Sequence, residues 1–170
     1  MIKLQTRRLI LSELTTQNAP FILQLYNDPN FIKYIGKKNI NNIRDAERFI
    51  DSSLKQSYKL YNHGLYLVQL KDSTSIGICG LLQRKYLNRP DIGFAALPDF
   101  RRMGFIYEAS KATIQDAKVR LCLDKISAIT SPDNNASIRL LMKLGFKFKK
   151  MISVNSNSEP TQLYSLHLDS

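Results

Sequence analysis

Apolar residues along the chain follow two different spacings, and the spacings alternate. Segments with a strand-like period, rich in Ile, Val, Leu, Phe and Tyr, predict strands at residues 5–11, 65–70, 76–83, 91–97, 126–130, 146–154 and 162–168. Apolar residues spaced three or four apart predict helices that include 21–26, 43–54, 106–121 and 136–144. Helix-ending signals support these limits, with Asp28-Pro29 after the first helix and Gly145 after the last.

Two groups of elements predict how the sheet is connected. The strands at 65–70 and 76–83 are separated by the turn residues Asp72-Ser73-Thr74-Ser75, which favours a hairpin. The strand at 91–97, the helix at 106–121 and the strand at 126–130 form a β-α-β unit, which requires parallel strands. No internal repeat or long linker divides the chain. We therefore expect a single α/β domain over residues 1–170, with flanking helices.

Composition narrows the class of protein. The chain has 170 residues and no run near the roughly 18–20 consecutive apolar residues of a membrane span. Its first residues lack the apolar centre of a signal peptide, so we expect a cytoplasmic protein. Cys79 and Cys122 lack metal-ligand spacing and lie in apolar segments, so we expect both thiols in the core. Lys and Arg number 25 against 14 Asp and Glu, a net charge of +11, which favours an anionic ligand such as nucleic acid, an acidic protein or a polyphosphate.

The segment PDFRRMGFIYEA at 98–109 has the chemistry of an anion site. It connects a predicted strand to a predicted helix, and the N–H groups at a helix start are unpaired and carry partial positive charge. Gly104 lets the main chain approach a phosphate closely, and Arg101 and Arg102 add fixed charge. An ordinary strand-to-helix connection with surface arginines also fits this pattern. A Walker loop does not, because no Gly-Lys-Ser/Thr follows.

The sequence R-R-M-G-F-I at 101–106 resembles the acetyl-CoA signature of the GNAT superfamily, Gln/Arg-x-x-Gly-x-Gly/Ala, with Ile106 in place of the final small residue. Other segments resemble the branch that acetylates ribosomal-protein N-termini, in the order of that branch: TRRLIL at 6–11, IGICGL at 76–81, DIGFAALP at 91–98 and NNASIRLLMKLGF at 134–146. Ser12 stands where the branch often has Arg, and Met142 where it often has Glu.

The resemblance implies a fold and a cofactor site. The fold is a mixed, mostly antiparallel sheet of about six or seven strands, in which the fourth and fifth strands (91–97 and 126–130) are parallel and splayed to hold the pantetheine arm of acetyl-CoA. Main-chain groups near Ala96 and Leu97 would pair with the pantetheine amides. Asn134 would cap the following helix or bind the pantetheine. The residues expected at the pyrophosphate are Arg101, Arg102, Met103, Gly104, Phe105 and Ile106.

Two side chains are candidates for catalysis. Asp91 opens the fourth strand, where the family often carries an acidic residue; we expect a base of ordinary pKa near 3.9 that acts through water, or else a solvated charge at the strand end. Ser137 is the candidate donor to the departing CoA thiolate, or a plain helix-start residue. The tyrosine that serves as acid in many GNAT enzymes falls at Leu141.

The function expected is direct transfer of acetyl from acetyl-CoA to a primary amine in a ternary complex, without a metal. The preferred acceptor is a polypeptide N-terminal α-amine. The alternatives are a small amine (a polyamine, an aminoglycoside or an amino acid) and a non-catalytic module that binds acyl-CoA or nucleic acid; the chain lacks a recognition helix for nucleic acid. Expected partners are acetyl-CoA, the acceptor and a second copy in a homodimer, with no membrane.

Overall fold

One twisted sheet organises the structure, a computed structural model that describes residues 1–154 and 159–168. The strand order is β1-β2-β3-β4-β5-β6-β8-β7, and only the β5–β6 pair is parallel. The strands are β1 (Ile2–Gln5), β2 (Leu9–Glu13), β3 (Leu65–Leu70), β4 (Ser75–Leu82), β5 (Asp91–Ala96), β6 (Lys125–Thr130), β7 (Lys147–Ile152) and β8 (Thr161–His167). The mixed, mostly antiparallel sheet that we expected is confirmed.

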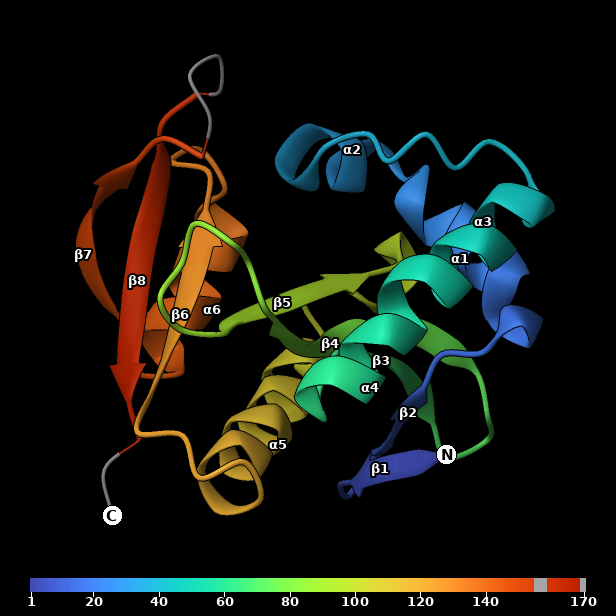
Figure 1. Cartoon of the computed structure of the whole chain (residues 1–170), viewed down its shortest axis with the longest axis horizontal. Helices are drawn as coiled ribbons and strands as arrows, with labels where there is room; N and C mark the ends of the chain where they lie inside the picture. The colour runs from blue at the N-terminus through green and yellow to red at the C-terminus, as the bar shows by residue number, and fades with distance from the viewer. Residues whose placement is uncertain (155–158, 169–170) are drawn as a thin grey trace.

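The helices pack against both faces of this sheet. They are α1 (Ala19–Tyr26), α2 (Pro29–Ile35), α3 (Ile43–Phe49), α4 (Lys55–Tyr61), α5 (Phe105–Val119) and α6 (Asn135–Lys143), and a π-helical turn, Ile50–Leu54, joins α3 to α4. One apolar core contains Ala109 of α5 and Leu141 of α6, and the other contains Ile22 of α1 and Ala46 of α3. Figure 1 shows α1 to α4 gathered on one side, with α6 beside β6.

The chain begins with two strands, so the single strand expected at 5–11 is wrong. Residues 6–8 form a turn in which the Thr6 hydroxyl accepts the Leu9 N–H at 3.0 Å and the Thr6 N–H donates to the Leu9 carbonyl at 3.0 Å. A threonine side chain that satisfies the backbone in this way favours a turn over continued strand. The extra strand accounts for an eight-stranded sheet where about six or seven strands were expected.

The hairpin and the β-α-β unit are both confirmed. β3 and β4 pair antiparallel, and β5, α5 and β6 follow one another with β5 and β6 parallel. The β5–β6 pairing consists of one register pair, Asp91 with Ser127. Beyond it the two strands diverge, as Figure 1 shows. The sheet therefore opens into a wedge that is closed at Asp91 and open toward the starts of α5 and α6.

The two cysteines have different surroundings. Cys79 is buried, as expected, and its Sγ lies 3.6 Å from the hydroxyls of Ser110 and Thr113. Cys122 is exposed, so its expected place in the core is wrong. It lies in the turn between α5 and β6, in a left-handed conformation with φ of 50°, and its Sγ donates to the Val119 carbonyl at 3.7 Å.

Candidate functional site

The turn before α5 presents free N–H groups at the open end of the wedge. The first helical hydrogen bond of α5 runs from the Glu108 N–H to the Gly104 carbonyl at 3.1 Å, so the N–H groups of Phe105, Ile106 and Tyr107 precede the hydrogen-bonded ladder. Among the residues that the structure describes, no side chain caps this helix start. Gly104 has φ of 77°, a left-handed conformation that a side chain would strain. This turn can bind an anion through its main chain.

Arg101 holds the turn in place. Its Nε donates to the Ala96 carbonyl at 3.0 Å, and its Nη2 donates to Asp28 Oδ2 at 2.5 Å. Asp28 is buried and also caps α2 by accepting the Phe31 N–H at 3.0 Å. The Arg101 side chain is thus committed to protein partners that link β5 to α2. Arg102, by contrast, is exposed beside the turn.

Arg8 lies against the same turn from the β1–β2 hairpin. Its Nη1 donates to the Met103 carbonyl at 3.2 Å, and its guanidinium carbon lies 4.5 Å from the centre of the Phe105 ring. Its Nε pairs with Glu108 Oε2 at 2.6 Å. Burial raises the pKa of Glu108, but the hydrogen bonds from Thr6 and Arg8 outweigh it and hold that pKa below its usual value. Arg8 therefore adds positive charge next to Gly104 and ties the turn to the sheet.

The main chain of β5 faces the wedge at alternate residues. The Leu97 N–H donates to the Ile76 carbonyl at 2.9 Å, so it points to β4. Because residues of an antiparallel strand alternate in direction, the main-chain groups of Phe94 and Ala96 point away from β4, toward β6. The register with β6 ends at Asp91, which leaves these groups without a neighbouring strand. Ala96 thus faces the wedge through its N–H, whereas the Leu97 N–H is already bonded.

Asp91 lies at the closed end of the wedge and is buried, with 1% of its side chain exposed. Arg84, from the β4–β5 loop, donates through Nε to both carboxylate oxygens at 2.9 Å. Burial raises the pKa of Asp91 to about 6, and the charge of Arg84 opposes that rise. The expectations of an ordinary pKa and of a solvated strand end are both wrong, because burial disfavours the ionised form.

The start of α6 lies across the open end of the wedge from the α5 turn. Asn134 caps α6, since its side-chain oxygen accepts the Ser137 N–H at 3.2 Å. Ser137 is half-buried in the first turn of the helix. Leu141, one turn later, is buried in the core, so this position supplies no acid.

A surface cavity of about 560 Å³ adjoins the closed end of the wedge. The β4–β5 loop crosses in front of β6 and forms one wall with Tyr86 and Arg89 (Figure 1). Ser127, the register partner of Asp91, contributes to the floor. The other lining residues are Leu87, Asn88, Lys125, Lys149, Lys150, Met151, Ile152, Ser153, Leu163 and Ser165. A ligand in this cavity would lie beside the Asp91–Ser127 pair.

Comparison with known proteins agrees with this geometry. The model of the acetyltransferase (GNAT) domain matches residues 8–147, from Arg8 beside the turn to the first residue of β7. The chain belongs to the GNAT acetyltransferase family. It is an acetyl-CoA-dependent N-acetyltransferase, with acetyl-CoA as co-substrate.

Relatives and solved structures resemble this acetyltransferase along nearly its whole length. The uncharacterized N-acetyltransferase YoaA of Bacillus subtilis is 29% identical over 170 residues, covering 96% of this chain and 95% of YoaA. The ribosomal-protein-S5-alanine acetyltransferase of Vibrio fischeri superposes with a TM-score of 0.82 at 17% identity, covering 99% and 98% of the two chains. The microcin C7 self-immunity acetyltransferase, solved with acetyl-CoA and AMP, gives 0.80 at 19% identity, covering 95% and 93%.

Three features of the site were not found from the sequence. Arg8 and Glu108 lie 100 residues apart, and Arg101 and Asp28 lie 73 apart, so no local pattern connects them. Arg84 lies in a loop without periodicity.

Among residues 1–154 and 159–168, no helix is long and apolar enough to cross a membrane, and no three His, Cys, Asp or Glu side chains group as metal ligands.

Proposed function

We propose that this acetyltransferase acetylates the N-terminal α-amine of a polypeptide. The observation that carries the proposal is the open cavity of about 560 Å³ lined by Ser127, the register partner of Asp91, through which a chain end would approach the closed end of the wedge. The similar structure from Vibrio fischeri is named for acetylation of a ribosomal protein at alanine, and another similar structure is named a ribosomal L7/L12 α-N-protein acetyltransferase.

The wedge and the α5 turn are suited to acetyl-CoA. The N–H groups from Arg102 to Ile106 would hold the pyrophosphate, as free helix-start donors hold anions. Main-chain groups of Phe94 and the Ala96 N–H face the wedge and would pair with the pantetheine amides, whereas the Leu97 carbonyl already accepts the Phe100 N–H at 3.1 Å. Asn134, which already caps α6, would contribute from the other side. β5 rises about 3.3 Å per residue, so its six residues are long enough for the pantetheine arm to lie along them from the turn before α5 to Asp91.

Bound acetyl-CoA supplies a thioester whose carbonyl carbon accepts the amine nitrogen. The carbon–nitrogen bond forms as the carbon–sulfur bond breaks, and the amine loses one proton. Asp91 takes that proton through water. Ser137 donates a hydrogen bond to the departing thiolate, which is stable enough to leave near neutral pH because a thiol pKa is about 8.5.

An α-amine suits this base better than a lysine side chain does. The α-amine has a pKa of about 7.7–8.0, against about 10.4 for lysine, so much more of it is neutral near pH 7. A buried carboxylate whose pKa is raised to about 6 matches the α-ammonium more closely than a carboxylate of ordinary pKa. The buried Asp91 therefore favours the α-amine.

Thiol release from acetyl-CoA tests the proposal directly. A panel would contain peptides with free N-termini, the same peptides with blocked N-termini and an internal lysine, spermidine, an aminoglycoside and free amino acids. We expect release with the free peptides and none with their blocked counterparts. Faster thiol release with spermidine or with a blocked, lysine-containing peptide would show that the proposed α-amine acceptor is wrong. The acetyltransferase activity itself would not be contradicted.

A further inference from the structure

The cavity beside Asp91 and Ser127 has a floor built from three strands. Ser127 pairs in register with Ser165, and Ser165 pairs with Lys147 of β7. Lys125 is two residues from Ser127, and Lys150 pairs with Leu163, two residues from Ser165. Because side chains two apart in a strand share a face, Lys125, Ser127, Ser165 and Lys150 point to the same side of the sheet.

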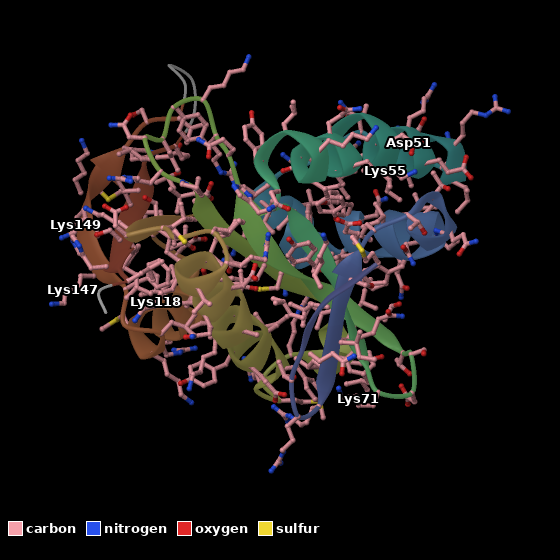
Figure 2. The ribbon with its side chains drawn as sticks, turned by 60° about the horizontal axis from the view of Figure 1, so that its bottom comes forward. Asp51, Lys55, Lys71, Lys118, Lys147 and Lys149 are labelled. Atoms are coloured by element: carbon pink, nitrogen blue, oxygen red, sulfur yellow. The ribbon has the colours of Figure 1, made fainter. Side chains whose placement is uncertain are left out.

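Within residues 1–154 and 159–168, the lining of this cavity is positively charged and contains no carboxylate. Its four cationic residues are Arg89, Lys125, Lys149 and Lys150. Arg89 pairs with Asp124, at 2.8 Å, whereas the three lysines form no ion pair within the part of the chain that the structure describes. Figure 2 places Lys149 on β7 next to Lys147, at the opposite side of the molecule from Lys71. Like charges that line a concave surface raise the local concentration of anions.

Ser165 gives this cavity an unused hydrogen-bonding group. The residue is 5% exposed, and its Oγ has no hydrogen-bond partner among residues 1–154 and 159–168. Buried polar atoms in proteins are nearly always paired, and an unpaired one is costly. A ligand oxygen that enters the cavity would accept a hydrogen bond from this hydroxyl.

From three lysines without an ion pair among the described residues, two of them on the face of Ser165, and from the unpartnered Ser165 hydroxyl, we infer that the acceptor carries carboxylates directly behind its reactive amine. The inference rests on the proposed function and deepens it: the substrate is a polypeptide whose N-terminal residue is followed by Asp or Glu. The α-amine would lie toward Asp91, the first acidic side chain against Lys125 and Ser165, and the next between Lys149 and Lys150. Basic N-terminal sequences would be repelled by the same lysines.

We would compare three peptides of equal length that share the same first residue and carry Asp, Asn or Lys at positions 2 to 4. The measurement is kcat/KM of each peptide at low ionic strength. We expect the Asp peptide to exceed the Asn peptide by about tenfold, and the Lys peptide to be the poorest, because each exposed ion pair changes affinity by roughly two- to fivefold. The preference for the Asp peptide should weaken with added salt.

Variants assign the preference to the cavity. K125Q/K150Q should reduce the Asp-to-Asn ratio to about twofold or less, since it removes the two lysines that share a face with Ser165. Ser165→Ala should lower turnover of the Asp peptide more than that of the Asn peptide. Lys71→Gln removes an exposed lysine from the β3–β4 turn and should leave the ratio unchanged.

The outcomes separate this inference from the proposed function. Equal turnover of the three peptides, or a ratio that K125Q/K150Q and K71Q change alike, overturns the inference while peptide acetylation stands. If no peptide is acetylated but a small amine bearing a carboxylate or phosphate is, the polypeptide acceptor is wrong, and with it this inference.

Discussion

At the scale of single residues, the environment of Asp91 could not be predicted from its position. The sequence placed an acid at the start of a strand, which is usually solvated. The structure buries it under the β4–β5 loop and pairs it with Arg84, seven residues earlier in a segment without a repeating pattern. Burial then raises its pKa toward the range in which a carboxylate can serve as a base near neutral pH.

Asp91 should therefore set the acid side of the pH–rate profile. Above a pKa of about 6 the carboxylate is ionised and can accept a proton, so kcat/KM for a free α-amine peptide should rise through pH 6. It should rise further as the α-amine, whose pKa is about 7.7–8.0, becomes neutral, and level off at about pH 9. Asp91→Asn should lower kcat/KM by about 10²-fold and remove the first rise. A first rise that persists in a folded Asp91→Asn variant would show that another group is the base.

The role of Ser137 can be tested directly, because the position where many GNAT enzymes carry a catalytic tyrosine holds Leu141, which is buried. Ser137→Ala should lower kcat by roughly 10- to 1000-fold and leave the affinity for acetyl-CoA, measured by calorimetry, nearly intact. Ser137→Thr retains the hydroxyl and is the matched control. If affinity falls in Ser137→Ala while turnover of bound substrate does not, the serine binds the co-substrate and does not act on the thiolate.

At the scale of elements, the turn before α5 is the part that the sequence described best. A glycine at a helix start beside two arginines marked the segment, and the structure shows free N–H groups and a left-handed Gly104 there. The roles of the two arginines could not be separated from the sequence, because Asp28 is distant along the chain. Arg101 holds the turn to β5 and α2, and Arg8 supplies a cation that no local pattern indicated.

A pair of variants tests the turn without confusing strain with charge. Asn and Asp both tolerate a left-handed conformation and have nearly the same shape, so Gly104→Asn and Gly104→Asp differ mainly by one negative charge. A carboxylate at this turn would repel the pyrophosphate. Acetyl-CoA affinity measured by calorimetry should be at least tenfold weaker for Gly104→Asp than for Gly104→Asn, about 1.4 kcal/mol. Equal affinities in the two folded variants would place the pyrophosphate elsewhere.

At the scale of the whole molecule, periodicity predicted most of the elements and the β-α-β unit. It could not predict the N-terminal hairpin, because a three-residue turn through Thr6 interrupts an apolar run only briefly. It also could not predict the cavity, whose walls come from the β4–β5 loop and from β6, β7 and β8. Registers among distant strands decide which lysines share a face, and a single sequence does not contain those registers.

We propose that this GNAT enzyme transfers acetyl to a polypeptide α-amine. The most direct measurement is fragmentation mass spectrometry of one peptide that offers both a free N-terminus and an internal lysine, after incubation with the enzyme and acetyl-CoA. We expect acetyl on the N-terminal nitrogen and none on the lysine, since the α-amine is far more neutral than the lysine near pH 7. Acetyl on the lysine with a free N-terminus would contradict it.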